Sequence, residues 1–174
     1  MLDAESIARI VRRMAVEIVE RTAGRALGLV GVRRGGVPIA ERLAAEITRL
    51  EGRPVPVGTI DITLYRDDAA TALPDPKVGP SAIAYPIDGL DVVLVDDVLH
   101  TGRTVRAAIT CLLDYGRPRR VWLAALCDRG GRELPVAPDF VGRTIEVPEG
   151  ARLEVAADGG PGDHARIVHA EVGP

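Results

Sequence analysis

The chain has 174 residues, of which 47% are hydrophobic and 27% charged, and its formal net charge at pH 7 is −3. This length predicts one domain with a sizeable core, spanning residues 1–174. No apolar run reaches 18 residues, so no membrane span is expected, and the overall charge does not favour nucleic-acid binding. Aromatic residues make up only 3%, too few for a platform that stacks single-stranded bases.

The start of the chain and its two cysteines predict a cellular compartment. Asp3 and Glu5 do not fit the basic and apolar pattern of a signal peptide, so we expect a cytoplasmic protein. Cys111 falls in a predicted helix and Cys127 at the end of a predicted strand. Their spacing fits neither a disulfide framework nor a metal site, which predicts reduced thiols.

The first element is an amphipathic helix that begins after an N-cap at Asp3 and ends near Gly24. Its polar face carries a row of arginines, which is either a solvated face or a surface for phosphates. The apolar face repeats at helical spacing. Its members are Ile7, Ile10, Val11, Met14 and Ile18, and the arginines are Arg9, Arg12, Arg13 and Arg21.

A strand over 26–32 precedes a short polar turn, and Pro38 begins a helix that runs to about Leu50. The turn has two arginines, which could neutralise a multiply charged anion, and two glycines, which let backbone N–H groups approach a ligand. Glycines at strand-to-helix turns are also common without any ligand. The turn residues are Arg33, Arg34, Gly35 and Gly36.

Residues 55–64 predict a second central strand with one polar face. Residues 69–81 contain three prolines and predict a long loop, which is either a lid or a crossover without a role.

The most informative stretch is 92–104. Four apolar residues predict a strand buried on both faces; two carboxylates, a tight turn and a helix over 105–115 follow. Ligands of an open α/β sheet bind outside the carboxyl ends of the strands, and N–H groups at a helix start suit a phosphate. With the carboxylates beside them for hydroxyl groups, the stretch predicts a sugar-phosphate site. The alternative is an acidic strand cap followed by an N-cap threonine, and no P-loop pattern is present.

A further strand over 119–126 delivers a polar, glycine-rich loop to the same edge of the sheet. The last third, 143–172, predicts a terminal β-hairpin around the turn 158–163. His164 and His169 lie in it and have no third partner at ligand spacing, so we expect surface residues.

The order of residues in 92–104 resembles the 5-phosphoribosyl-1-diphosphate (PRPP) motif of type I phosphoribosyltransferases. Four longer blocks resemble one family among them, the bifunctional pyrimidine operon regulators that also act as uracil phosphoribosyltransferases (the PyrR family). The resemblance implies an α/β type I phosphoribosyltransferase fold, with a mostly parallel central sheet flanked by helices and a β-rich C-terminal hairpin or hood. It also implies a homodimer or a larger homo-oligomer. The blocks are 30–40, 57–68, 92–107 and 116–142.

The activity implied by the resemblance is the conversion of uracil and PRPP to UMP and pyrophosphate, with Mg²⁺ bridging substrate oxygens. Asp96 and Asp97 are expected to hold the ribose hydroxyls, directly or through Mg²⁺-bound water, and to favour a cationic sugar. Asp97 is the group expected to assist any proton removal from the base. The turn at 33–36 is expected to bind the pyrophosphate. The PRPP motif comprises Val92, Val93, Leu94, Val95, Asp96, Asp97, Val98, Leu99, His100, Thr101, Gly102, Arg103 and Thr104.

For the base, the resemblance implies stacking by Phe140, main-chain hydrogen bonds from Val141 and a nearby Arg129. The implied reaction must keep water from the reactive sugar, so we expect the long loop at about 67–82, with Lys77, to act as a lid.

Several positions depart from the family pattern. His100 stands where tyrosine is usual, Gly131 where histidine is usual, and Gly35 where an arginine is common. Ala137 stands where RNA-binding relatives carry an arginine, and the segment 142–149 stands where they have a lysine-bearing segment that runs into Pro-Thr-Ser. The motifs that imply catalysis are therefore retained, while the basic positions that imply RNA binding are fewer than in the RNA-binding relatives.

The remaining candidate for contact with the leader mRNA of a pyrimidine operon is the face with Arg12, Arg13 and Arg21. Two further functions stay open. One is a regulator that senses UMP and PRPP with little catalysis, and the other is a phosphoribosyltransferase for another base, such as a purine.

Overall fold

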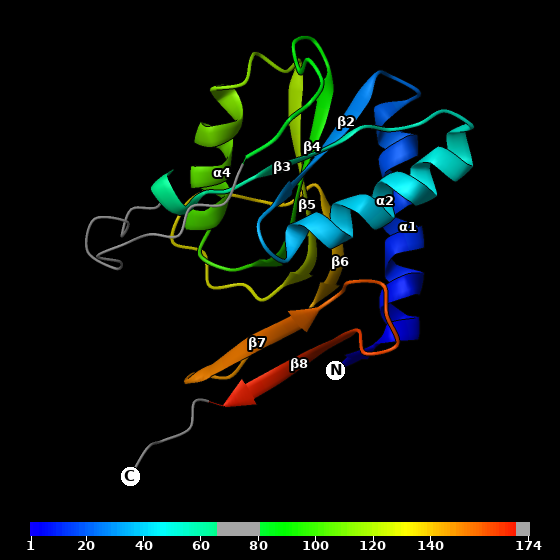
Figure 1. Ribbon diagram of the computed structural model, residues 1–174. Coiled ribbons are helices and arrows are strands. Elements are labelled where there is room, and N and C mark those ends of the chain that lie inside the picture. The colour runs from blue at the N-terminus through cyan, green and yellow to red at the C-terminus, as the bar shows by residue number, and fades with distance from the viewer. Residues whose placement is uncertain (66–80, 170–174) are drawn as a thin grey trace.

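The computed structural model describes residues 1–65 and 81–169, so Lys77 and nearly all of the predicted lid lie outside the described residues. A five-stranded parallel sheet forms the centre, in the order β3 (Val57–Ile60), β2 (Leu27–Val32), β4 (Asp91–Leu99), β5 (Arg120–Asp128), β6 (Phe140–Thr144). Helices α1 (Ala4–Thr22) and α2 (Gly36–Glu51) cover one face, and α4 (Arg103–Leu113) covers the other (Figure 1). The predicted α/β architecture is confirmed.

Strand β4 is the centre of the sheet and divides the core in two. Val93 and Val95 pack toward α1 and α2, whereas Val92 and Leu94 pack toward α4. All four side chains are fully buried, because successive residues of a strand point to opposite faces and both faces are covered. The predicted doubly buried strand is confirmed, and it continues through the two acids to Leu99.

Helix α1 follows its predicted pattern. The Asp3 carboxylate accepts a hydrogen bond of 2.8 Å from the Ser6 N–H, which is the expected N-cap. The apolar residues predicted for its inner face are buried. The helix ends at Thr22, and Ala23 adopts the left-handed cap conformation with φ 50°, one residue before the predicted glycine.

The strand predicted over 55–64 is wrong in length and in place. Strand β3 has four residues and lies at the edge of the sheet rather than at its centre. The Asp61 carboxylate accepts hydrogen bonds from the Thr63 N–H (2.9 Å) and hydroxyl (2.5 Å), and residues Thr63–Tyr65 form a short 3₁₀ helix, η1. Local bonding by an aspartate side chain ends the strand, because it replaces the ladder by a turn.

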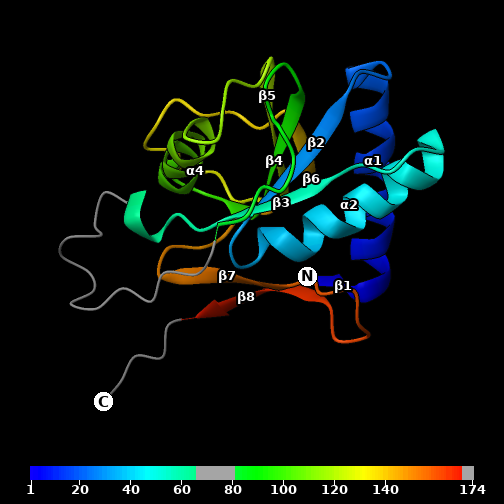
Figure 2. The same cartoon turned by 45° about the horizontal axis from the view of Figure 1, so that its top comes forward.

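A second, antiparallel sheet of three strands is made by β1 (Leu2–Asp3), β8 (His164–His169) and β7 (Ala151–Ala156). We call this sheet the hood; it lies across the carboxyl ends of the parallel strands (Figures 1 and 2). The hairpin of β7 and β8 confirms the prediction for the last third of the chain. Strand β1 was not predicted, because two residues carry no periodicity.

The arginines of α1 have a structural role at the edge strand β6. The Arg13 guanidinium donates hydrogen bonds to the carbonyls of Val141 (2.9 Å) and Gly142 (2.6 Å). Arg21 donates to the Asp139 carbonyl, just before the strand, at 2.7 Å. An edge strand exposes unpaired backbone groups, so these contacts protect the sheet as well as anchoring the helix.

These contacts bear on the RNA prediction for α1, which stays a prediction. Two of the three arginines proposed for RNA contact, Arg13 and Arg21, donate to backbone carbonyls, and all three lie beside carboxylates, so the face does not present three uncompensated positive charges. The pairs are Arg12 with Glu46 at 3.7 Å, Arg13 with Glu17, and Arg21 with Asp139 at 3.5 Å.

Both cysteines are buried and free, as predicted. Within the described ranges, no helix has the length and apolar character needed to cross a membrane.

The two neighbouring arginines of α1 provide a stability test. Replacing Arg13 by methionine is expected to lower the free energy of unfolding by about 1–2 kcal/mol, because two backbone acceptors lose their donor. The matched change Arg12→Met removes only a long, exposed ion pair and should cost less than about 0.5 kcal/mol. Urea unfolding followed by circular dichroism measures both, and equal losses would contradict the structural role of Arg13.

Candidate active site

A cavity of about 250 Å³ opens at the carboxyl ends of the parallel strands. Its walls come from the turn after β2, the end of β3, the end of β4 and the start of α4. It therefore joins the predicted pyrophosphate turn, the two acids and the predicted phosphate turn in one site. The lining residues are Arg33, Arg34, Asp61, Ile62, Thr63, Asp96, Asp97, Val98 and Thr104.

The two acids are held rigidly by β4. The Asp97 N–H donates to the Asp96 carboxylate at 3.0 Å, and the Val98 N–H donates to the Asp97 carboxylate at 2.8 Å. Asp96 is 5% exposed. Burial and the neighbouring Asp97 raise the pKa of Asp96 well above its ordinary value. Asp96 is therefore neutral more readily than an exposed carboxyl group, and a bound cation would favour its ionised form.

The turn after β2 lies directly against these acids. A Cβ added at Gly35 would overlap the Asp97 carboxylate, and one added at Gly36 would overlap the Val95 carbonyl oxygen. Only glycine permits this approach, so the turn that presents Arg33 and Arg34 is packed on the end of β4. The peptide bond between these two arginines is cis.

The phosphate turn is built at the N-terminus of α4. Gly102 is the N-cap residue with φ 91°, a left-handed conformation that favours glycine. The Arg103 N–H donates to the Thr101 hydroxyl at 3.3 Å, and its guanidinium pairs with Glu133 at 2.6 Å. Thr104 is the member of this turn that reaches the cavity. The first N–H groups of an eleven-residue helix thus end at the site, an arrangement suited to an anion.

The apolar members of the PRPP motif support the site without lining it. Residues 92–95 and Leu99 are buried in the core, and only Val98 among the apolar ones lines the cavity.

His100 and Gly131, two of the departures from the family pattern, are neighbours in space. A Cβ at Gly131 would lie 2.9 Å from the His100 Nε2 atom. Because this atom is the far end of an exposed side chain that can turn away, the constraint at position 131 comes mainly from its φ of 70°, a conformation that favours glycine.

The stacking role predicted for Phe140 is contradicted by its burial. Phe140 is 1% exposed, and its ring centroid lies 5.7 Å from that of Trp122 in the core beneath α1. It pairs in register with Ala124, four residues before the end of β6. The Val141 carbonyl is also engaged, because it accepts the hydrogen bond from Arg13. Neither residue lines the cavity.

Arg129 does not line the cavity, and its place near the base stays a prediction. It follows β5 directly, and its guanidinium lies 3.5 Å from the Ala151 carbonyl at the start of β7, so it spans from the sheet edge to the hood.

Asp61, Ile62 and Thr63 are site residues that the sequence analysis missed. They were assigned to a continuing strand, whereas the structure turns them into the cavity wall. The available signal was the Asp-Ile-Thr order, since an aspartate two residues before a threonine favours a side-chain turn.

Comparisons with known proteins agree with this geometry. The model of the phosphoribosyl transferase domain matches residues 1–156. The Bifunctional protein PyrR of Pelotomaculum thermopropionicum is 52% identical over 157 residues, covering 90% of this chain and 86% of that protein. The Bifunctional protein PyrR of Thermus thermophilus is 46% identical over 159 residues, covering 91% and 88%.

Solved structures show the same fold at low identity. A hypoxanthine-guanine phosphoribosyltransferase from Bacillus anthracis aligns with a TM-score of 0.68 and 20% identity, covering 83% of this chain and 82% of that one. The hypoxanthine phosphoribosyltransferase of Trypanosoma cruzi, in complex with its product IMP, aligns with a TM-score of 0.66 and 19% identity, covering 84% and 75%. The chain belongs to the phosphoribosyltransferase family and, within it, to the bifunctional PyrR proteins.

Proposed function

We propose that the protein is a uracil phosphoribosyltransferase, which converts uracil and PRPP to UMP and pyrophosphate. The observation that carries the proposal is the single cavity in which an arginine–glycine turn, two adjacent acids and a helix N-terminus meet. The base is assigned from the roughly 50% identity to PyrR proteins and from the family resemblance of the sequence.

Each part of PRPP has a proposed partner. The start of α4, with Thr101 and Thr104, holds the 5′-phosphate through N–H groups and hydroxyls. Asp96 and Asp97 hold the ribose hydroxyls next to it. Residues 33–36 hold the pyrophosphate, because the arginine charges stabilise the leaving group while the glycines keep it close to the acids.

The acids also fit a magnesium ion. Two adjacent carboxylates beside an anion-binding turn suit a cation that keeps most of its waters and binds mainly through substrate oxygens. Asp96 and Asp97 would hold Mg²⁺ there, and the ion would supply charge stabilisation for a departing pyrophosphate. Asp97 accepts a proton from the base if one is removed, and the carboxylates stabilise positive charge at the sugar.

The base is proposed to lie between the end of β4 and the hood. Val98 lines the cavity, and Ile145, Leu153 and Val155 are partly buried apolar residues that pack against the same core as Val98. The Arg129 guanidinium lies 3.5 Å from the Ala151 carbonyl at the start of β7. A planar pyrimidine fits between such apolar side chains, with polar groups at its edge. The lid with Lys77 and the assembly of at least two copies stay predictions.

A turnover assay with a panel of bases tests the function. With PRPP and Mg²⁺, the protein is expected to convert uracil and to leave hypoxanthine and guanine unchanged. Turnover of a purine without uracil would establish the other-base alternative. Saturable UMP binding without turnover of any base would establish a nucleotide-sensing regulator instead.

Replacing Asp97 by asparagine tests the role of the acids. The amide oxygen can still accept from the Val98 N–H, so the fold should persist, while kcat should fall by about 100-fold or more through loss of the charge. Steady-state kinetics and a melting curve measure the two effects. Asp158 is exposed in the turn between β7 and β8, so the control variant Asp158→Asn should keep normal kinetics. Near-normal activity of the Asp97→Asn variant would overturn the role proposed for Asp97.

A second candidate function is RNA binding by a pyrimidine-gene regulator. The similarity to proteins named bifunctional favours it. Among the α1 arginines we propose only Arg12 for phosphate contact, because its side chain is 64% exposed and its ion pair with Glu46 is the longest of the three.

Gel-shift titration with the protein's own leader transcript tests this candidate. Binding is expected to require UMP and to weaken with salt, and Arg12→Met should reduce the slope of log affinity against log salt by about one. Absence of binding at low salt with UMP present would exclude RNA regulation, and an unchanged slope would exclude Arg12.

A further inference from the structure

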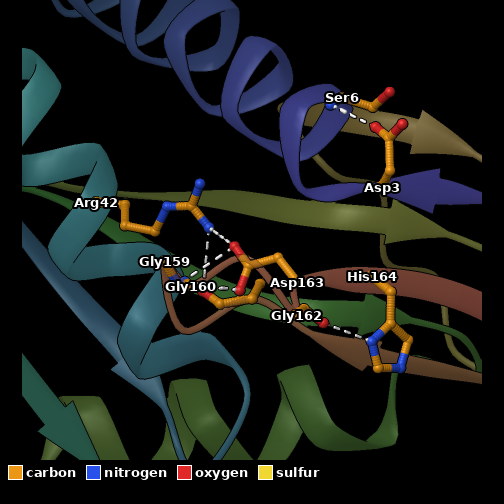
Figure 3. A network of polar contacts seen from close by, with 9 residues as sticks. Asp3, Ser6, Arg42, Gly159, Gly160, Gly162, Asp163 and His164 are labelled. Carbon is orange, nitrogen blue, oxygen red and sulfur yellow. Dashed lines mark hydrogen bonds and ion pairs between the residues drawn. The ribbon is translucent and has the colours of Figure 1, made fainter.

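The turn that joins β7 and β8 is tied to α2 by one buried carboxylate. The Asp163 side chain is 4% exposed and accepts a hydrogen bond of 2.6 Å from the Arg42 guanidinium (Figure 3). It also accepts from the N–H groups of Gly159 (3.1 Å) and Gly160 (3.2 Å). A buried charge with three separate donors is well satisfied, so it holds the turn in one conformation.

Arg42 extends this anchor to the other side of the turn. The same guanidinium nitrogen lies 3.2 Å from the carbonyl of Ala157, the residue after β7. Ala157 and Ala165 are themselves buried in the core shared with α1 and α2. The closed end of the hairpin is therefore fixed to α2 by charge, by backbone bonds and by packing.

Helix α2 also carries the pyrophosphate turn. It begins at Gly36, which packs against the carbonyl of Val95, and Arg42 lies six residues later. At 1.5 Å per residue, the anchor is about 9 Å along the helix from the turn. One rigid element thus holds both the pyrophosphate turn and the closed end of the hood.

The open end of the hairpin belongs to the part of the hood assigned above to the base. The Ala151 carbonyl at the start of β7 contacts Arg129, and Leu153 and Val155 pack against the core that Val98 also contacts. Because β7 is short and paired along its whole length with β8, a shift of the closed end is transmitted to these two side chains.

We propose that Arg42 and Asp163 are a positioning pair, which sets the height of the hood over the cavity and thereby the affinity for the acceptor base. Neither residue touches the reacting atoms. PRPP binds to the end of the parallel sheet, so its affinity does not depend on this pair. The proposal rests on the proposed function, since it assigns the space beneath β7 to the base.

Two substitutions separate positioning from simple stabilisation. Asp163→Asn keeps an oxygen for the glycine N–H groups but removes the charge. Arg42→Lys keeps the charge but not the forked donor. Asp163→Asn is expected to raise KM for uracil about five- to tenfold, because the hood would be displaced from the base. KM for PRPP and kcat should stay within about twofold. Arg42→Lys should show a smaller increase of the same kind.

The matched control lies on the same hairpin. Glu154 pairs with Arg166 at 2.7 Å and contacts the His164 ring at 3.2 Å, so Glu154→Gln removes a more exposed carboxylate of the same hairpin without touching α2. It should leave all three kinetic constants unchanged. Equal losses in kcat and in both KM values for the Asp163 and Arg42 variants, or an unchanged KM for uracil, would overturn the proposal.

Hydrogen–deuterium exchange gives a readout that needs no activity. Faster exchange confined to residues 151–169 is expected in Asp163→Asn and Arg42→Lys, with β4 unchanged; unchanged exchange in the hood would overturn the anchor. If Asp163→Asn does not fold, Arg42→Lys carries both measurements. A wild-type protein that does not convert uracil would overturn the proposed function, while the exchange experiment still decides whether the pair holds the hood.

Discussion

The site depends on one strand that is buried on both faces and ends in two carboxylates. Because β4 is packed between α4 on one side and α1 with α2 on the other, the backbone at Asp96 and Asp97 cannot relax toward solvent. The neighbouring N–H groups orient the carboxylates before any ligand arrives. Charges fixed in this way act on a developing positive charge without the cost of reorganising solvent.

The rest of the site is arranged by close approach to that strand. Gly35 and Gly36 bring an arginine-bearing turn into contact with β4, and α2 begins at the same point. Because the start of α2 is packed against the end of β4, parts of the fold that contact α2 further along are held at a fixed distance from Asp96 and Asp97. Through Arg42, these include the closed end of the hood, so the arginine-bearing turn and the hood are both attached to the same helix.

Arginine residues in this chain illustrate why charge alone does not define a surface. Arg12 and Arg13 are adjacent in sequence, yet one is exposed beside a distant carboxylate and the other donates to two carbonyls of the edge strand. A basic row on a helix is compatible with nucleic-acid binding and with protection of a sheet edge. Only the position of β6 against α1 separates the two roles.

The sequence by itself determined the features that depend on neighbours along the chain. The apolar run of β4, the N-cap at Asp3 and the helical spacing of α1 are local, and the PRPP motif is contiguous, so its strand, acids and turn could be placed before the structure. The tertiary structure decided what depends on distant partners: the edge position of β3, the burial of Phe140 and the addition of β1 to the hood. The physical reason is register, because Phe140 is buried by its pairing with Ala124 and its contact with Trp122, and no pattern within residues 137–142 contains either partner.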